Sequence, residues 1–185
     1  MVNTEKKQTG IFYGWWIVVS AFIMSFVYSG FYFWAFTLFV TPMQAEIASI
    51  ENHIGPAFLI AGIVGAILAP ILGNIFDKRG PKLVVGFGMI FGGLGFALMG
   101  IMQEIWHLYL GLSLAGIGPI AIWAGAIPSV ANWFNIFRGR ALGLTTAGLG
   151  LGGLLTNPSL MFINEFGWRT TFVLIAAAIW IIILP

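Results

Sequence analysis

Residues 73–82 read GNIFDKRGPK, and this charged stretch lies between two long uncharged segments of the chain. It contains one of the six acidic residues, Asp77, and three of the eight basic ones, Lys78, Arg79 and Lys82. Charge that is confined to a short loop between apolar segments marks the point where a chain leaves a lipid bilayer. The stretch therefore predicts a tight turn at a membrane surface.

The composition of the whole chain agrees with a membrane location. Charged residues make up 8% of the chain and hydrophobic residues 59%, whereas soluble domains have about 25% charged residues. A soluble helical protein could not cover so much apolar surface with so few charges. The net charge of +2 and the scattered basic residues do not favour nucleic-acid binding. The absence of cysteine excludes a disulfide framework and a thiolate metal site.

Uncharged runs between the charged residues give the number of membrane crossings. Each run is long enough for one helix, which needs about 20 residues to cross the hydrocarbon core. The first run is also far longer than the apolar region of a signal peptide, which is about 7–15 residues, so we expect it to be retained. We predict an all-α membrane protein with a short N-terminal segment at residues 1–10 and six transmembrane helices within 11–185. The expected helices span residues 11–40, 54–76, 83–102, 106–131, 141–164 and 167–185.

The basic residues predict the orientation of this bundle. With an even number of helices, the basic positions within 6–7, 78–82 and 138–140 all lie on one side, and Arg169 is the only basic residue on the other. Cytoplasmic loops are enriched in lysine and arginine. We therefore expect a multi-pass protein of the plasma (inner) membrane with both termini in the cytoplasm.

Some motifs that point to enzyme or cofactor chemistry lack the context that such chemistry needs. Residues 148–153 read GLGLGG, but no strand precedes them, so a dinucleotide site is not expected. His53 and His107 have no further ligand at metal-binding spacing. No Ser/His/Asp set or pair of carboxylates occupies a common face. We expect no enzyme activity, no cofactor and no metal.

Several stretches spread over nearly the whole chain resemble one family of transporters. They are, in chain order, YGWW at 13–16, GNIFDKRGPK at 73–82, WFNIFRGRALG at 133–143 with TAGLGLG at 146–152 and Asn157-Pro158, and GWR at 167–169. Together they resemble the monocarboxylate and oxalate/formate branch of the major facilitator superfamily. The stretch at 133–143 is the most specific to this branch, whereas 73–82 marks only the superfamily.

The resemblance implies the N-terminal six-helix half of a twelve-helix carrier, with the solute site between the two halves at mid-membrane. The expected function is secondary active transport of a small organic anion by alternating access. The implied partners are the lipid bilayer, the anion and a missing C-terminal half. Two alternatives stay open: a non-transporting structural or regulatory subunit of a membrane complex, and a six-helix half that dimerises to form a carrier. A further hydrophobic half in the intact gene would discriminate among them.

The same resemblance implies that helices one and four line the solute cavity. The substrate-binding candidates are the aromatic or polar residues midway along the helices, namely Tyr28, Tyr32, Trp34, Trp123 and Asn157. The alternative role of the aromatic residues is packing or lipid contact. The alternative role of Asn157 is a hydrogen bond between helices.

A second group of residues is implied to control conformation. In the family, the counterpart of Asp77 holds the two halves together on the cytoplasmic side. The candidates for this gating role are Gly73, Asp77, Lys78, Gly80, Lys82 and Arg138. Apart from Arg169 at the start of the last one, no charged residue lies inside a predicted span, so this half contains no obvious proton relay. The substrate, the coupling ion and the direction of transport are left open.

Overall fold

The chain folds into a bundle of long apolar helices, as its uncharged runs predict. The computed structural model describes residues 13–47, 49–134 and 136–183, and within these ranges it contains helices and short turns but no strand. Five continuous helical stretches in these ranges are long and apolar enough to cross a membrane. They are Gly14–Glu46, Glu51–Arg79, Pro81–Gly100, Ile105–Trp133 and Arg138–Ile182. The expected all-α membrane fold is confirmed, and residues 1–10 lie outside the described part of the chain.

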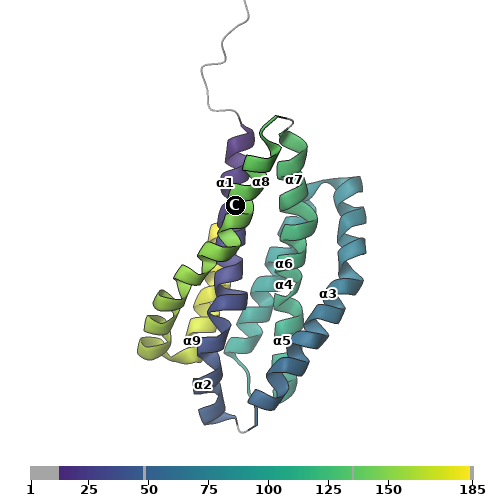
Figure 1. Cartoon of the computed structure of the whole chain (residues 1–185). Helices are drawn as coiled ribbons and strands as arrows, with labels where there is room; N and C mark the ends of the chain where they lie inside the picture. The colour runs from purple at the N-terminus through teal and green to yellow at the C-terminus, as the bar shows by residue number, and fades with distance from the viewer. Residues whose placement is uncertain (1–12, 48, 135, 184–185) are drawn as a thin grey trace, which may run out of the picture.

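Most of these stretches consist of several shorter elements (Figure 1). The first contains α1 (Gly14–Ser29), η1 (Gly30–Trp34) and α2 (Phe36–Glu46), and the next two are α3 (Glu51–Arg79) and α4 (Pro81–Gly100). The fourth contains α5 (Ile105–Ala115), α6 (Ile117–Ala121), η2 (Ile122–Ala126) and α7 (Ile127–Trp133). The last contains α8 (Arg138–Leu151), η3 (Gly152–Leu155) and α9 (Thr156–Ile183).

The number of continuous stretches is five rather than six because the last one contains both the fifth and the sixth expected helix. Gly167 interrupts α9 with φ 78° and ψ 161°, a conformation that lies outside the helical region. Figure 1 shows the chain running down from α8 and then back up through the yellow end of α9. A single glycine reverses the chain here, because glycine adopts positive φ without steric cost. No separate loop divides the two segments, which we call the fifth and sixth legs of the bundle.

The turn at residues 73–82 is also tighter than expected. Helix α3 continues to Arg79 and α4 begins at Pro81, so only Gly80 separates them. Gly80 has φ 81°, and Pro81 occupies the first turn of α4, where the missing N–H of proline costs nothing.

At the other end of the bundle, the first crossing extends to Glu46 rather than to residue 40. We call these two ends the Gly80 end and the Glu46 end.

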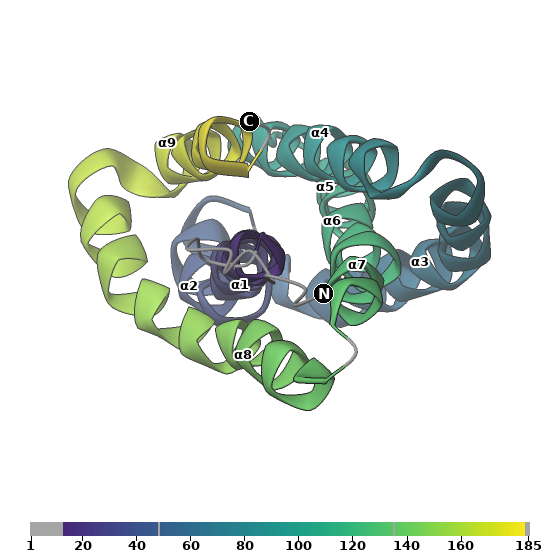
Figure 2. The same ribbon diagram turned by 90° about the horizontal axis from the view of Figure 1, so that it is seen from above.

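The helices pack in a pattern that matches an inverted repeat. Helix α1 packs on α8, α3 on α5, and α4 on the sixth leg in α9 (Figure 2). These pairs join legs one and five, two and four, and three and six. An exchange of legs one, two and three with legs four, five and six converts the first pair into the second and leaves the third pair unchanged. This pairing is therefore consistent with a 3+3 repeat within the described bundle.

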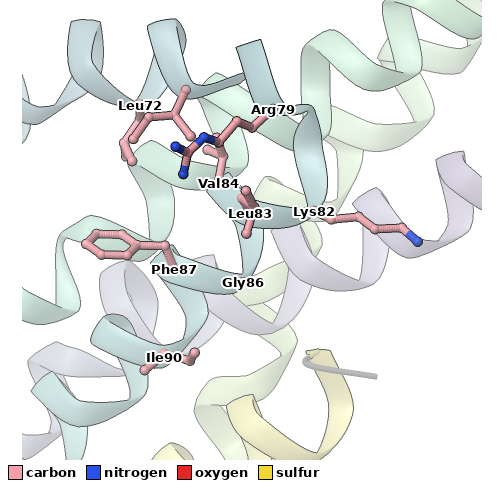
Figure 3. Close-up of a pocket in the computed structure, with 9 residues that line it drawn as sticks. Leu72, Arg79, Lys82, Leu83, Val84, Gly86, Phe87 and Ile90 are labelled. Atoms are coloured by element: carbon pink, nitrogen blue, oxygen red, sulfur yellow. The ribbon is translucent and has the colours of Figure 1, made fainter. Parts of the chain in front are cut away.

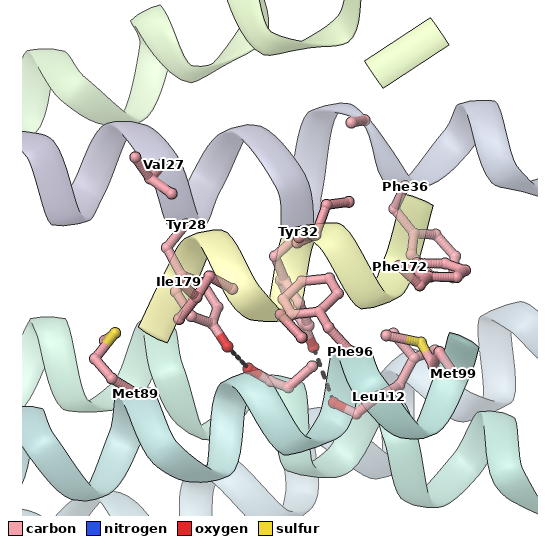
Figure 4. Close-up of a cluster of buried hydrophobic side chains, with 14 of the residues drawn as sticks. Val27, Tyr28, Tyr32, Phe36, Met89, Phe96, Met99, Leu112, Phe172 and Ile179 are labelled. Atoms are coloured by element: carbon pink, nitrogen blue, oxygen red, sulfur yellow. Dashed lines mark hydrogen bonds between the residues drawn. The ribbon is translucent and has the colours of Figure 1, made fainter. Parts of the chain in front are cut away.

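Two tyrosines form the centre of the bundle, between the first and fourth legs (Figure 4). The hydroxyl of Tyr28 donates a hydrogen bond of 2.6 Å to the carbonyl oxygen of Ala115, and that of Tyr32 donates a weaker one of 3.5 Å to the carbonyl of Leu112. Both rings contact Phe96 of α4 edge-on. In a bilayer, such polar contacts hold helices together where no hydrophobic effect distinguishes helix from lipid.

The ring of Tyr28 fits in a slot formed by two glycines. A Cβ atom on Gly92 of α4 or on Gly118 of α6 would overlap the phenol ring or hydroxyl of Tyr28. Tyr28 is 1% exposed and cannot swing away. The close approach of three legs at this point depends on the missing side chains.

A polar cluster joins three segments at the Glu46 end. Arg169 Nη2 lies 2.8 Å from Glu46 Oε2, and the indole N–H of Trp168 donates to Glu46 Oε1 at 3.0 Å. Arg169 also donates from Nη1 to the carbonyl oxygen of Met102, in the turn between α4 and α5. The cluster therefore ties the end of α2 and this turn to the start of the sixth leg.

The glycine slot can be tested with a matched pair of alanine variants. Gly118→Ala is expected to lower the thermal stability of the detergent-purified protein markedly, since overpacking of a tight core costs about 1–3 kcal/mol. Gly143→Ala, in α8, is the control, because a Cβ there meets nothing within 4 Å. Alanine is also the better helix former, so Gly143→Ala is expected to be neutral or stabilising. Equal melting temperatures of the two variants would contradict the slot.

Candidate solute-facing site

The first and fourth legs each contain one π-helical turn near the middle of the crossing. These turns are η1 at Gly30–Trp34 and η2 at Ile122–Ala126. Gly30 follows the start of the first leg at Gly14 by about as many residues as Ile122 follows the start of the fourth leg at Ile105. The two turns thus occupy corresponding positions of the repeat. Single π turns inside α-helices occur frequently at functional sites.

The π turn of the first leg presents Trp34 at an exposed position beside α8. The side chain is 49% exposed, and its indole N–H donates to the carbonyl oxygen of Leu149 at 3.0 Å. Ser29 donates its hydroxyl to the same oxygen at 2.9 Å. Two donors therefore fix the first leg to the fifth at the point where α8 passes into the tighter turn η3.

The π turn of the fourth leg presents Trp123 on a face that no other helix covers. On this leg Gly118 faces Tyr28 of α1, while Ala121 packs on α4. Residues two apart on a helix point in nearly opposite directions, so Trp123 points away from α4. It is 63% exposed, and within the described residues it has neither a hydrogen bond nor a ring contact. Its indole N–H is free to bind a ligand.

The other predicted substrate-binding residues lie in two different environments. Tyr28 and Tyr32 lie together, with ring centroids 6.2 Å apart, but they are buried, and their hydroxyls already donate to backbone carbonyls of α5 in the fourth leg. Asn157 lies exposed near the start of α9 and has no side-chain hydrogen bond to another described residue. The structure does not bring Asn157 into contact with either tyrosine.

The predicted gating residues gather at the Gly80 end. Asp77, Lys78, Lys82 and Arg138 are exposed, and none of them forms an ion pair or a side-chain hydrogen bond within the described part of the chain. Gly73 and Asp77 are four residues apart and share one face of α3. A Cβ on Gly73 would meet nothing within 4 Å. This face of α3 is therefore open to a further partner.

Sequence reasoning missed the contact between the first and fifth legs. Ser25 and Ser29 of α1 lie against Gly148 and Gly152: a Cβ on Gly152 would overlap the hydroxyl of Ser29, and one on Gly148 would overlap the backbone of α1 beside Ser25. The sequence does contain a signal for this contact. Ser25 and Ser29, like Gly148 and Gly152, are small residues four apart, which is the spacing of close helix contacts in membranes. The sequence could not show which small pairs face each other, nor that the carbonyl of Leu149 accepts two hydrogen bonds.

The described residues of the site are uncharged and mostly aromatic. Over the described ranges, no three His, Cys, Asp or Glu side chains lie close enough to hold a metal ion. The charged residues of the helical stretches lie at their ends or at the Gly167 reversal. The exposed mid-membrane surface of the first and fourth legs is instead aromatic, with Phe33, Trp34 and Trp123 all about half exposed or more.

Comparison with known proteins shows similarity to transporters. A model of the Major Facilitator Superfamily matches residues 21–184. The oxalate:formate antiporter of Oxalobacter formigenes is 30% identical over 156 residues, which are 83% of this chain and 37% of that protein. Monocarboxylate transporter 13 of Rattus norvegicus is 28% identical over 180 residues, or 95% of this chain and 41% of that protein. The chain thus spans less than half the length of these relatives.

Proposed function

Because the chain belongs to the Major Facilitator Superfamily, we propose that it forms the N-terminal half of a secondary active transporter for a small organic anion. Its family and its long apolar helices make it an integral membrane protein. The transported anion is of the monocarboxylate or oxalate/formate type and is carried by alternating access, without a change in its bonds. Similarity to an oxalate:formate antiporter and to a monocarboxylate transporter supports this substrate class.

The pair of π turns is the observation that supports a solute site on this half. Trp34 and Trp123 are exposed on π turns that lie at corresponding positions along the two legs that the repeat relates. A tryptophan away from the membrane interface needs a partner for its indole N–H. The carbonyl oxygen of Leu149 accepts the hydrogen bond from Trp34. We propose that the solute, or a water molecule bound to it, accepts the hydrogen bond from Trp123. Flat aromatic faces suit a small planar carboxylate.

The proposed site needs a second half for its charge. A carboxylate at mid-membrane requires a cation or strong hydrogen-bond donors, because an unpaired charge there is costly. The described helices of this chain carry no charged residue in the middle of a crossing. We therefore propose that the C-terminal half supplies the positive charge, and that Trp123, Trp34 and Asn157 shape the facing wall. Tyr28 and Tyr32 act behind that wall by fixing the first leg to the fourth.

The Gly80 end provides the proposed gate. The face of α3 that carries Gly73 and Asp77 is uncovered in this half, and it is suited to contact the second half when the transporter is closed at this end. Lys78, Gly80, Lys82 and Arg138 belong to the same end, which we place in the cytoplasm. Binding energy that differs between the two states shifts their populations and so controls turnover.

The role of Trp123 predicts a specific loss of affinity. In the full-length protein, Trp123→Phe replaces the indole by a phenyl ring, so it removes the N–H but keeps an aromatic face. It is expected to weaken solute binding about fivefold, which is the effect of losing one neutral hydrogen bond of about 1 kcal/mol. Binding of labelled oxalate, formate and lactate to the purified protein measures this effect. Trp106→Phe is the control, since Trp106 is similarly exposed but begins α5 at the Glu46 end. Unchanged affinity in Trp123→Phe contradicts the proposed wall.

The role of Asp77 predicts an effect on turnover. Asp77→Asn removes the charge from the open face of α3 and so shifts the population of closed states. It is expected to reduce transport into proteoliposomes at least tenfold, while the equilibrium affinity for the solute changes by less than about threefold. Glu104→Gln, an exposed acid at the opposite end, is the control. A large loss of affinity with normal turnover would assign Asp77 to the solute site instead.

The proposed orientation predicts the labelling of two single cysteines. The chain contains no cysteine, so Ser49→Cys and Ile136→Cys each provide one thiol at an exposed position near opposite ends of the bundle. In intact cells, an impermeant maleimide is expected to label position 49 and to leave position 136 unlabelled until the membrane is permeabilised. The reverse pattern would show the opposite orientation.

A further inference from the structure

A groove of about 370 Å³ lies between α3 and α4 at the Gly80 end (Figure 3). Its walls are apolar and come from Leu72 and Ile75 of α3 and from Val84, Phe87 and Ile90 of α4. Its mouth carries two cations, Arg79 and Lys82, and no acid lines it. The groove is separate from the exposed tryptophans of the solute-facing site.

The two cations have no partner of their own in the described structure. Neither Arg79 nor Lys82 forms an ion pair or a side-chain hydrogen bond there. Figure 3 shows the guanidinium of Arg79 above the groove near Val84, whereas the side chain of Lys82 extends past Leu83 in the opposite direction. Asp77, the nearest acid in sequence, is two residues from Arg79 and therefore points to nearly the opposite side of α3.

The long axis of the groove runs along the helices, from the membrane edge toward the hydrocarbon core. Leu83 and Ile90 both line it and are seven residues apart on α4, a rise of about 10 Å at 1.5 Å per residue. Positive charge therefore lies at the surface end, with an apolar channel below it. This is the arrangement of a phospholipid, whose charged head lies above an acyl chain.

We propose that this groove binds an anionic phospholipid, with its phosphate at Arg79 and Lys82 and one acyl chain along Leu72, Ile75, Phe87 and Ile90. Two cations without an acid favour a lipid with net negative charge over a zwitterionic one. Basic pockets between transmembrane helices on the cytoplasmic side are a known form of headgroup site. The cytoplasmic leaflet as the source of the lipid rests on the proposed orientation, whereas binding itself does not.

The lipid site also lies on a different face of α3 from the proposed gate. Leu72, Ile75 and Arg79 follow the i, i+3, i+7 spacing of one face, whereas Gly73 and Asp77 lie on another. Lipid binding and contact with the second half can therefore occur together on the same helix. The Gly80 turn, which is a single residue, places Lys82 in the first turn of α4 only three residues after Arg79 at the end of α3, so the long side chains of both can reach one headgroup.

The test measures retention of phosphatidylglycerol by the full-length protein, purified in detergent, with native mass spectrometry. Phosphatidylcholine of the same acyl chains is the competitor. Arg79→Gln is expected to lower phosphatidylglycerol affinity about fivefold, which corresponds to the roughly 1 kcal/mol that one basic residue contributes near an anionic surface. Arg140→Gln is the matched control, since Arg140 is an exposed arginine at the same end but outside the groove.

A second pair of variants separates charge from shape. Leu83 lines the mouth and is 52% exposed, so it tolerates substitution. Leu83→Glu places a negative charge there and is expected to abolish the preference for phosphatidylglycerol, while Leu83→Gln, of the same size, retains it. Glycerol 3-phosphate at equal concentration is expected not to compete, because it lacks the acyl chain.

Several results would overturn the site. They are an equal loss in Arg140→Gln, no loss in Arg79→Gln, the same behaviour of the two Leu83 variants, and competition by glycerol 3-phosphate. Retention in detergent is independent of orientation and of transport. Failure of the cysteine labelling pattern or of solute binding would therefore leave this test intact, and failure of this test would leave the proposed transport function standing.

Discussion

Close approach between helix backbones is the constraint on which the rest of this structure depends. A bilayer is as apolar as the helices it contains, so burial of side chains supplies little energy to hold them together. Contact at short range must do so instead. At the centre, the phenol of Tyr28 fits between Gly92 and Gly118 and bonds to the carbonyl of Ala115. Between the first and fifth legs, Gly152 allows Ser29 to reach the carbonyl of Leu149.

These contacts also explain how irregular turns persist at mid-membrane. A π or 3₁₀ turn disturbs the regular backbone hydrogen bonds of a helix, and in lipid any unbonded group costs several kcal/mol. In the first leg, η1 packs against η3 of the fifth, where Gly30 and Gly152 nearly touch. Protein rather than lipid therefore surrounds one side of both turns. The other side of η1 is left exposed, and this is where Trp34 lies.

The sequence predicted those parts of the fold that follow from charge and run length. The stretch at 73–82 predicted a turn, because charged residues lie at the surface of a bilayer. The uncharged runs predicted the membrane-length helices, because the thickness of the bilayer sets the length of a crossing. The residues at which the helices begin and end were less predictable. The first leg continues to Glu46, whose carboxylate is paired with Arg169, a partner more than a hundred residues away in the sequence. The sequence predicts a helix that starts at Gly167, and the sixth leg does begin at this reversal; the sequence could not show that no loop precedes it, since one residue with positive φ suffices.

The site was predictable only as a set of residue types. Unusual aromatic and polar residues in a membrane span can be found by inspection, and Trp34 and Trp123 do lie exposed at mid-helix. The direction of each side chain could not be found in this way, because a π turn changes the helical phase that sequence spacing assumes. Tyr28 and Tyr32 have the same four-residue spacing that a cavity face would have, and only the glycines opposite them show that they point into the bundle.

Helix α3 shows how one transmembrane segment can serve several contacts without mutual interference. It has the lowest burial among the membrane-length stretches, with 17% of its most apolar window inside the described structure. Toward the Glu46 end, Phe58 packs edge-on against Tyr32 and Phe36 of the first leg. Toward the Gly80 end, Gly73 and Asp77 leave one face open, while Leu72, Ile75 and Arg79 line the groove beside α4. At the Gly80 end one face of the helix packs, with Leu72 buried against Val84 and Ile117, while the face of Asp77 is exposed and can respond to what binds there. If a lipid fills the groove, it stiffens the part of α3 that carries Asp77, so the proposed lipid and gate would be coupled through the rigidity of this helix as well as through Lys82, which belongs to both.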